Sequence, residues 1–348
     1  MSEPKPITII GGGLAGLTLG IGLRQRNVPV IIREAGNYPR HRVCGGFISG
    51  RGQLILERLG IRKLLDDVGA VSACTAAFFT TTKATPVRPL PAAALCVSRH
   101  TLDALLAERF RELGGELQTG ARNDVTGILP AGMVRATGRR LQADQHGPRW
   151  FGLKMHARRV ALTADLEMHV SPRGYVGLCR INGGEVNICG LFRRLQGDKA
   201  PAQPADEWLR GEPQSLLRQR LNQAEFDPDS FCAVAGLSLQ PQRATRRGDI
   251  SLGDAITMIP PLTGNGMSMA FESAELAIEP LVAWSRGGLS WGNAHKQIAR
   301  ACDHAFDRRL AWAKRLQYSV LTPWLQNILL LLAARSDRVW RLAFDKTR

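Results

Sequence analysis

A glycine-rich segment near the start of the chain has the residue types and spacing of a phosphate-binding turn. An apolar run, residues 7–10, leads into it, and a second apolar run, residues 28–32, follows. The turn contains three glycines: Gly11, Gly13 and Gly16. The first allows a tight turn, the second lets backbone N–H groups approach a pyrophosphate, and the third lets helix and strand pack closely. Glu34 closes the second run, where its carboxylate can accept from a ribose hydroxyl. The spacing predicts a dinucleotide site.

A second glycine-rich segment, far along the chain, could bind the other end of the same molecule. Residues 249–255 are expected to form a buried strand ending at Asp254, whose carboxylate can accept hydrogen bonds from a polyol such as a ribityl chain. A Pro- and Gly-rich turn, residues 260–267, follows and opens a helix. Its glycines expose N–H groups and the positive end of the helix dipole, which would stabilise the anionic edge of a reduced flavin. We therefore expect the two segments to hold one flavin dinucleotide.

A third candidate segment is the polar loop 38–52, which contains Cys44-Gly45-Gly46. A single cysteine is most often a small buried hydrophobe, and the two glycines alone could explain a tight turn. The alternative, that Cys44 supplies a proton or gates access of the substrate, is implied only by the family resemblance given below. The other six cysteines are scattered, with no Cys-x-x-Cys pair and no His/Cys cluster at ligand spacing. We expect reduced thiols and no metal site.

The elements that must position these segments follow from hydrophobic periodicity. Residues 7–33 predict a β-α-β unit, and residues 53–68 predict a helix with a leucine-rich buried face. A β-prone piece, residues 77–82, precedes the proline-rich stretch 85–91. Next, residues 99–113 predict a helix that Ser98 caps and that ends at a Gly-Gly pair.

The middle of the chain changes to short segments of β-type residues. The expected strands are residues 151–157, 161–170, 175–181 and 185–192. Turn sequences separate them, and Asn182-Gly183-Gly184 is a strong hairpin signal. The pattern predicts an antiparallel sheet over residues 150–195, inserted between parts of the nucleotide-binding domain. Residues 197–228 predict a loop and a helix.

The tail, residues 284–348, predicts helices. Apolar residues recur there at every fourth position: Trp312, Leu316, Val320, Trp324, Ile328 and Leu332. Arginines and lysines lie beside this stripe. Two interpretations stay open, a helical cap packed on the core and a membrane-surface helix that receives lipid. The apolar run 328–334 is far too short to span a bilayer.

The charge of the chain bounds its partners. A net charge of +16, mostly from arginine, could attract nucleic acid, anionic lipid or an acidic carrier protein. Dispersed arginines and only 6% aromatic residues argue against nucleic acid. The simplest interpretation is a basic solvated surface. Residues 1–6 carry no basic n-region, so we expect a cytoplasmic protein, with an anionic membrane or an acidic carrier protein as candidate peripheral partners.

These motifs together resemble the FAD motifs of the p-hydroxybenzoate hydroxylase superfamily, which includes aromatic hydroxylases, flavin halogenases and geranylgeranyl reductases. Residues 39–46 are similar to the loop of the geranylgeranyl reductase branch, where a Cys-Gly-Gly segment lies beside the flavin. The resemblance covers most of residues 1–285 and implies roles in binding FAD or in catalysis. The implied cofactor-binding residues are Gly11, Gly13, Ala15, Gly16, Glu34, Arg42, Gly45, Gly46, Arg99, Gly253, Asp254, Pro261, Gly264, Asn265, Gly266 and Met267, and the implied catalytic residue is Cys44.

The fold class that follows is α/β (α+β): a Rossmann-like FAD-binding domain, an inserted antiparallel β-sheet substrate domain and a helical C-terminal tail. The FAD-binding domain is expected in three parts, residues 1–72, 96–149 and 241–285. The substrate domain is expected at residues 73–95 and 150–240, and the helical region at residues 286–348.

The expected activity is that of an FAD-dependent oxidoreductase acting on an apolar lipidic, isoprenoid or polyketide-like secondary metabolite. The leading reaction is C=C reduction, in which reduced flavin delivers hydride and Cys44, or a water that it orders, supplies the proton. The alternative is oxygen-dependent hydroxylation of an aromatic or polyketide substrate, which needs a pocket that excludes water. NAD(P)H is a candidate electron donor, although residues 136–139 lack the Asp that the family often carries. A basic nucleic-acid or scaffolding protein, the remaining class, would carry no flavin.

Overall fold

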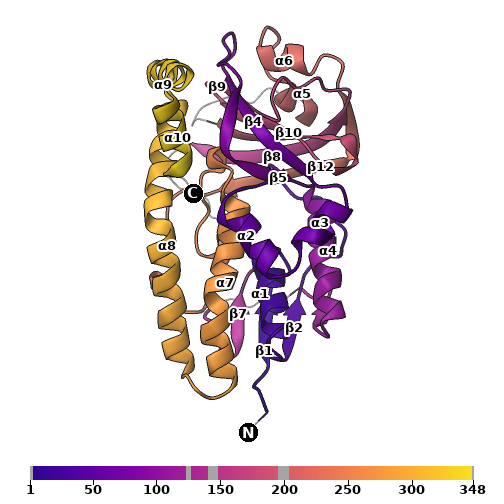
Figure 1. Ribbon diagram of the computed structural model, residues 1–348, viewed down its shortest axis with the longest axis vertical. Helices are drawn as coiled ribbons and strands as arrows, with labels where there is room; N and C mark the ends of the chain where they lie inside the picture. The colour runs from indigo at the N-terminus through magenta and orange to yellow at the C-terminus, as the bar shows by residue number, and fades with distance from the viewer. Residues whose placement is uncertain (1–2, 123–126, 140–147, 195–203, 347–348) are drawn as a thin grey trace.

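The computed structural model describes residues 3–122, 127–139, 148–194 and 204–346. Within these residues two sheets organise the chain, a small one at the N-terminal end and a larger one above it (Figure 1). The described small sheet has four strands in the order β6-β2-β1-β7, and the described large sheet has eight in the order β12-β8-β11-β10-β9-β4-β5-β3. This architecture confirms the α/β class with a Rossmann-like sheet and C-terminal helices.

The small sheet is parallel and forms around the first apolar runs. Its elements are β1 (Ile7–Ile10), α1 (Leu14–Arg24), β2 (Val30–Arg33), β6 (Glu116–Gln118) and β7 (Met133–Arg135). Strand β1 pairs in parallel with both β2 and β7, and β2 pairs in parallel with β6. The β-branched residues of β1 and β2 suit such a central position. The predicted β-α-β unit is confirmed.

The large sheet contains the strands that were predicted for the middle of the chain. Its elements are β3 (Phe47–Ile48), β4 (Val71–Phe79), β5 (Arg88–Cys96), β8 (Arg149–Arg158), β9 (Leu166–Ser171), β10 (Gly174–Arg180), β11 (Val186–Arg194) and β12 (Glu225–Leu237). The Asn-Gly-Gly turn joins β10 to β11 as an antiparallel hairpin, as predicted. Strands β4 and β9 pair in parallel, so the sheet is mixed rather than purely antiparallel.

Two local predictions are wrong, and the proline-rich stretch, for which no element was predicted, contributes to a strand. The single helix expected at residues 53–68 is two, α2 (Arg51–Arg58) and α3 (Arg62–Asp67), because Gly60 takes a φ of +72° and ends the first. The proline-rich stretch 85–91 runs into the start of strand β5. Strand β3 pairs only with Leu95 and Cys96 at the end of β5, so the prolines at its start lie at an open edge of the sheet. Residues 249–255 form one isolated bridge at Ser251 and a 3₁₀ turn, not a strand.

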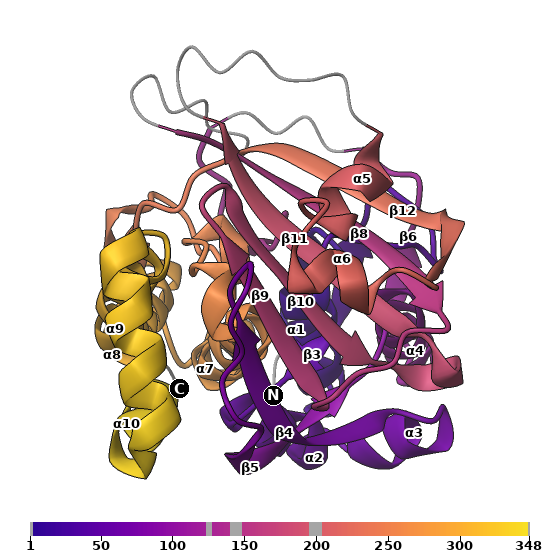
Figure 2. The ribbon, with the colours of Figure 1, turned by 90° about the horizontal axis from the view of Figure 1, so that it is seen from above.

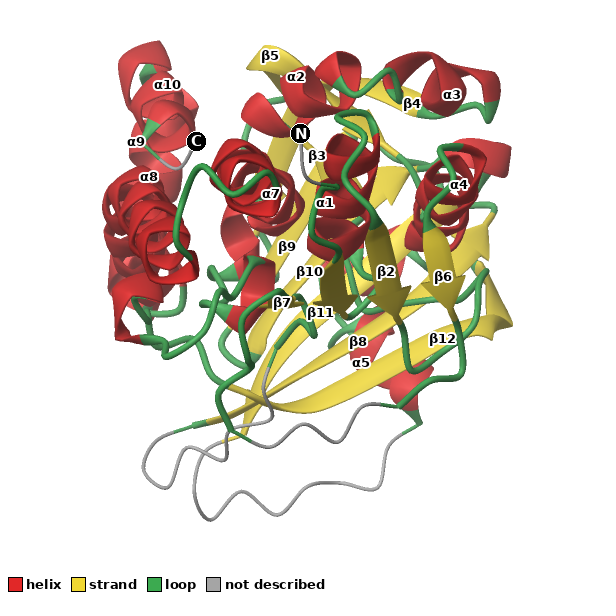
Figure 3. Ribbon diagram, turned by 90° about the horizontal axis from the view of Figure 1, so that it is seen from below, coloured by secondary structure: helices red, strands yellow, loops and turns green. Residues whose placement is uncertain are grey.

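Helices pack against the small sheet and beside the large one. They are α4 (Arg99–Glu112), α5 (Ala205–Arg210), α6 (Leu216–Arg220), α7 (Gly266–Ser285), α8 (Trp291–Val320), α9 (Pro323–Arg335) and α10 (Asp337–Asp345). The Ser98 side chain accepts from the Thr101 N–H and caps α4, as predicted. Helices α1, α4 and α7 lie side by side next to the small sheet (Figure 3). Part of the loop and helix expected at 197–228 lies outside the described residues.

The large sheet has two different faces. Leu153 and Met155 of β8 belong to an apolar cluster that α5 and α6 cover on the outer face. Because side chains alternate along a strand, Lys154 and His156 point to the other face, toward the nucleotide-binding half of the molecule. The main apolar core lies between the small sheet and helices α1, α4, α7 and α8. The inner face of the large sheet therefore borders the candidate site.

Candidate functional site

One cleft of about 710 Å³ brings together most of the predicted site residues. The predicted residues that line it are Gly11, Gly13, Ala15, Glu34, Arg42, Cys44, Gly45, Arg99, Gly253, Asp254, Pro261, Gly264, Gly266 and Met267. They come from the β1–α1 turn, the loop after β2, the start of α4, the 3₁₀ turn Gly253–Ala255, and the turn before α7 with its first residues. Gly16, Gly46 and Asn265 are not among the lining residues. The two glycine-rich segments, which are far apart in the sequence, thus line the same cleft.

The first glycine turn has the geometry that its three positions require. Gly11 has a φ of +107°, and a Cβ there would lie 2.4 Å from the Ala136 carbonyl oxygen. A Cβ at Gly16 would lie 2.0 Å from the Gly11 carbonyl oxygen, so this glycine serves the packing of helix on strand. A Cβ at Gly13 would meet no described atom within 4 Å. There is therefore no room for a side chain at Gly11 or Gly16, whereas the space beside Gly13 is open.

Two helix N-termini open on this cleft. Helix α1 follows Gly13, which has no side chain to cap it, and α7 follows Asn265, whose side chain does not bond to the first turn in the described structure. Gly264 supports the second turn with a φ of +63°. Helix starts of this kind present N–H groups and the positive end of a dipole to an anion. The arrangement fits a ligand with negative charge near both ends.

Glu34 is a structural clamp as well as a lining residue. Its carboxylate accepts from the backbone N–H of Gly12 at 2.7 Å and of Gly36 at 2.9 Å, and it forms an ion pair with Arg40 at 2.7 Å. Burial alone would raise the pKa of Glu34, but the hydrogen bonds from Gly36 and Arg40 hold it below its ordinary value. The carboxylate therefore stays ionised and fixes the glycine turn. Sequence analysis predicted the ribose contact and missed this clamp.

Two predicted arginines share a buried acid. Both Arg99 and Arg42 reach Asp103, with Arg99 donating from Nε at 2.6 Å and from Nη2 at 2.8 Å, and Arg42 Nε at 3.3 Å. Burial acts to lower the pKa of Arg99, but Asp103 and Cys44 beside it hold that pKa above its ordinary value. Asp103 was not predicted, although its position four residues after Arg99 on one helix is a recognisable ion-pair spacing. It fixes both guanidinium groups at the cleft.

The lining of the cleft carries more positive than negative side chains. The arginines are Arg33, Arg40, Arg42, Arg99, Arg122 and Arg139, against the acids Glu34 and Asp254. Burial raises the pKa of Asp254, and Arg139 and Arg99 act against that rise. A positive cleft with two helix N-termini, open space beside Gly13 and an acid at each glycine segment fits the pyrophosphate and hydroxyl groups of FAD.

A second, apolar pocket of about 200 Å³ adjoins this cleft. The residues that line both are Gly45, Phe47, Pro261 and Gly264. Strands β4, β9 and β10 form one wall, and the end of α8 with α9 and α10 forms the other. Figure 2 shows these three helices beside the edge of the large sheet. An apolar ligand in this pocket would meet the cofactor loops at its inner end.

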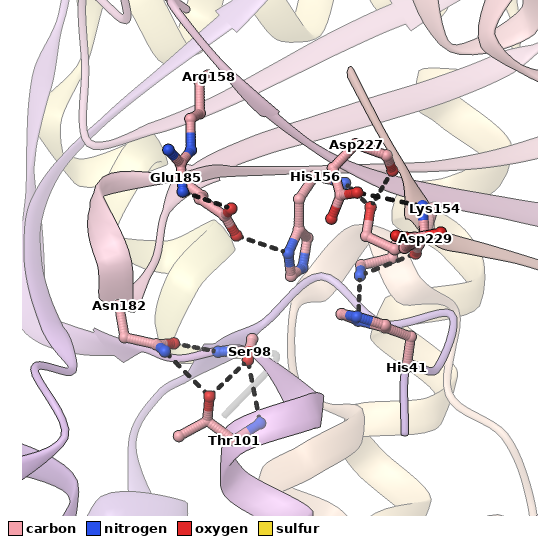
Figure 4. A network of polar contacts seen from close by, with 11 residues as sticks. His41, Ser98, Thr101, Lys154, His156, Arg158, Asn182, Glu185, Asp227 and Asp229 are labelled. Atoms are coloured by element: carbon pink, nitrogen blue, oxygen red, sulfur yellow. Dashed lines mark hydrogen bonds and ion pairs between the residues drawn. The ribbon is translucent and has the colours of Figure 1, made fainter. Parts of the chain in front are cut away.

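A polar cluster lies behind the cofactor loop, on the inner face of the large sheet (Figure 4). Lys154 Nζ lies 3.0 Å from His41 Nδ1 and donates to the Ser230 carbonyl at 3.2 Å. The His156 Nδ1 atom lies 3.0 Å from Glu185 Oε2. The His41 ring stacks on His100, with centroids 4.5 Å apart. Sequence analysis missed this cluster, because strand pairing brings its members together.

Burial keeps the histidines of this cluster neutral. It lowers the pKa of His156 to about 4 and that of His41 to about 4, and the charge of Lys154 adds to both effects. Burial also lowers the pKa of Lys154 to about 8, although the nearby side chains of Cys232 and Cys189 act to raise it. Since His156 is neutral, its Nδ1–H donates to Glu185. Its Nε2 is buried without a hydrogen-bond partner among the described residues.

Cys44 lies at the edge of the cleft, half-buried, next to the shared Gly45. Asn187 Nδ2 donates to its backbone carbonyl at 3.0 Å, and the Cys179 thiol donates to the Gly45 carbonyl at 3.2 Å. The large sheet thus holds the Cys-Gly-Gly loop directly. All seven cysteines fall within the described ranges and none forms a disulfide. Among the described residues, no cluster of His, Cys, Asp and Glu has an arrangement that could hold a metal ion.

Comparisons with known proteins bear on the fold. No family model matches the chain. A menaquinone reductase of Mycolicibacterium smegmatis is 23% identical over an alignment 394 positions long, covering 99% of this chain and 91% of that protein. The structure of the flavin-dependent brominase Bmp2 has a TM-score of 0.71 at 17% identity, over 96% of this chain and 94% of that chain. PqsL of Pseudomonas aeruginosa, a probable FAD-dependent monooxygenase, has a TM-score of 0.68 at 14% identity, over 99% of this chain and 100% of that chain.

These likenesses establish the fold, which is that of FAD-dependent hydroxylase-like oxidoreductases. The placement in the geranylgeranyl reductase branch, the roles of the individual site residues and the domain boundaries stay predictions. In the part of the chain that the structure describes, none of the helices has the length and apolar character needed to cross a membrane.

Proposed function

We propose that this chain is an FAD-dependent oxidoreductase that acts on an apolar substrate. One observation carries the proposal: the arginine-lined cleft, onto which two helix N-termini open, adjoins an apolar pocket through Gly45, Phe47, Pro261 and Gly264. When bound, FAD would supply two-electron and oxygen chemistry at the place where the two cavities meet.

The residues of the chain divide the work between binding and exclusion of water. The N–H groups of the β1–α1 turn would bind the pyrophosphate, with Arg42 and Arg99 nearby, and Asp254 would accept from ribityl hydroxyls. The first turn of α7 would stabilise negative charge at the edge of the flavin ring. The apolar walls of the substrate pocket would exclude water from the reacting atoms.

Oxygen-dependent hydroxylation is the first candidate reaction. Solved structures of the same fold support it, since PqsL is described as a probable FAD-dependent monooxygenase and Bmp2 as a flavin-dependent brominase. The apolar pocket supports it too, because such a reaction needs a dry site rather than one particular side chain. An aromatic or polyketide-like substrate would suit this pocket.

Reduction of a C=C bond is the second candidate reaction. A menaquinone reductase aligns with 99% of this chain, which supports a reductase. Hydride would add to one carbon, and Cys44, or a water beside it, would give a proton to the other. NAD(P)H is the proposed source of the electrons. Under this reaction Cys44→Ala should keep its FAD and lose 10²- to 10⁴-fold in turnover, about the range for a positioned proton donor.

An anaerobic experiment separates the two reactions. The purified protein is reduced without oxygen and mixed with a prenylated quinone or an aromatic polyketide, and oxygen is then admitted. If hydroxylation is the reaction, the flavin stays reduced until oxygen enters and the product gains one oxygen atom. Reoxidation before oxygen enters, together with a saturated product, contradicts hydroxylation and establishes the reductase. A protein that carries no flavin and takes up none contradicts both.

A further inference from the structure

Helix α9 is apolar on both of its sides. Its inward residues Leu329 and Leu330 line the apolar pocket, together with Gln326. Four apolar residues point outward and are between 46% and 64% exposed: Trp324, Ile328, Leu331 and Leu332. Their spacing places them on one face of the helix. A helix that is apolar all round is normally buried, and a contiguous exposed apolar face marks a surface that another body covers.

The wall of the pocket at this point is one helix thick. Val339, Trp340 and Phe344 of α10 continue the lining beside α9. Trp340 Nε1 donates to the Pro89 carbonyl at 2.9 Å, which fixes α10 to strand β5. Helix α8 is fixed to strand β10 in a similar way, because the Tyr175 hydroxyl donates to Gln317 Oε1 of α8 at 3.3 Å. Helix α9 packs against both of these anchored helices, and it lies at the outer edge of the molecule (Figures 1 and 2).

Positive charge borders the exposed apolar face. Arg335 ends α9, and Arg338 and Arg341 follow on α10, all three exposed. Leu342, also on α10, is 47% exposed. Residues 323–334 contain no charged side chain. An apolar face with an exposed tryptophan, bordered by arginines and too short to span a membrane, has the composition of a helix that lies in the interface of an anionic bilayer.

We propose that α9 docks on an anionic phospholipid bilayer, with Trp324, Ile328, Leu331 and Leu332 inserted and Arg335 and Arg338 on the headgroups. The apolar substrate then passes from the bilayer, beside α9, into the pocket. The docking stands on the surface alone, whereas the substrate route rests on the proposed function. A second copy of this chain is a poorer occupant, because a two-fold contact would bring like arginine clusters together.

Vesicle binding tests the docking. The FAD-loaded protein is sedimented with vesicles of phosphatidylglycerol and phosphatidylcholine, and with vesicles of phosphatidylcholine alone. We expect binding to the anionic vesicles that weakens as salt rises. Trp324→Glu/Leu331→Glu should lower the affinity at least tenfold, whereas Leu54→Glu, at an exposed leucine on α2, should not. Arg335→Glu/Arg338→Glu should also weaken binding, unlike Arg58→Glu/Arg111→Glu on α2 and α4.

The outcomes that overturn the docking are distinct from those that overturn the proposed function. Flavin content and melting temperature of each variant show whether it is folded. A folded, yellow protein that ignores anionic vesicles, or a Trp324→Glu/Leu331→Glu variant that binds them like the wild type, overturns the docking only. A dimer that this same variant dissociates assigns the face to a second copy and also overturns it. A colourless protein that binds vesicles overturns the proposed function and leaves the docking in place.

Discussion

The buried histidines behind the cofactor loop are held uncharged by their surroundings. His156 lies among strands of the large sheet, and its neighbours include Lys154 and His41. Burial removes the water that would solvate a charge on the His156 ring, and the positive charge of Lys154 makes a second positive charge costlier. The contact between the large sheet and the loop 38–46 therefore depends on keeping these rings neutral.

Lowering the pH from 7 to 5 should for this reason destabilise the protein. The pKa of His156 is about 4 in the folded state against 6.5 for an unperturbed histidine, so the unfolded chain binds more protons between these values. The contribution of this residue is complete above pH 6.5 and is lost as the pH falls toward 4. The stability lost through this residue amounts to about 2 kcal/mol at pH 5. Denaturant unfolding at the two pH values measures it.

The control for this prediction is a histidine at the surface. His156→Gln, which cannot titrate, should lose less stability between pH 7 and 5 than the wild type does. His304→Gln, at an exposed position of α8, should lose as much as the wild type. Equal losses in wild type and His156→Gln would show that His156 is not held neutral.

Local motifs at the residue scale were predictable, and contacts made through strand pairing were not. Gly11, Gly13 and Asp254 could be found because a nucleotide turn is contiguous in sequence, and the structure places all three at one cleft. Lys154 and His41 are far apart in the chain and meet only through the position of β8. A lone lysine in a strand carries no signal of its partner.

At the scale of elements, the tail shows how a regular pattern can hide a break. The apolar residues at every fourth position from Trp312 to Leu332 predict one continuous helix face. In the structure, however, α8 ends at Val320 and α9 starts at Pro323. Leu316 and Val320 therefore line the pocket, whereas Trp324 and Ile328 are exposed. Pro323 was the available signal, because proline favours the first turn of a new helix.

Strand β12 was missed for a related reason. Its sequence contains Asp227-Pro228-Asp229, which resembles a turn. In the structure, the pairing of β12 with β8 shifts register between Asp227 and Cys232, so an irregularity absorbs the proline. Pairing with a long neighbour outweighed the local propensity.

Strand β10 offers a way to narrow the apolar pocket without straining the backbone. Gly177 lines the pocket, and a Cβ there would lie 3.6 Å from the Met168 Cε and 3.8 Å from the Cys189 carbonyl oxygen, which are ordinary contacts. Gly177→Val should therefore fold, keep its FAD and raise KM for the apolar substrate about tenfold, equivalent to about 1.4 kcal/mol. Steady-state kinetics on the substrate identified in the anaerobic experiment measure this.

The matched control is Gly292→Val, at an exposed position near the start of α8 where an added Cβ meets no described atom within 4 Å. It should leave KM unchanged. An unchanged KM in Gly177→Val, with normal FAD content, would place the substrate outside this pocket.

At the scale of the whole molecule, buried ion pairs join the tail to the nucleotide-binding half. Glu272 of α7 is fully buried and accepts two hydrogen bonds from Arg309 of α8, at 2.6 Å and 2.9 Å, and it also pairs with Arg51 of α2 at 3.1 Å. Helix α8 is thereby fixed against the core. The fold class could be predicted from motifs and resemblance, but the helical wall of the pocket could not, because its packing depends on side chains distant in sequence.

If FAD binds between the N-termini of α1 and α7, which lack side-chain caps, the purified protein carries flavin, and its flavin content is the decisive measurement. We expect a yellow protein that releases FAD, not FMN, on denaturation. Gly13→Val should lose this FAD, because its side chain would fill the open space beside the turn, whereas Gly292→Val should keep it. A colourless protein that takes up no added FAD, or a Gly13→Val variant that holds FAD as the wild type does, would contradict the account.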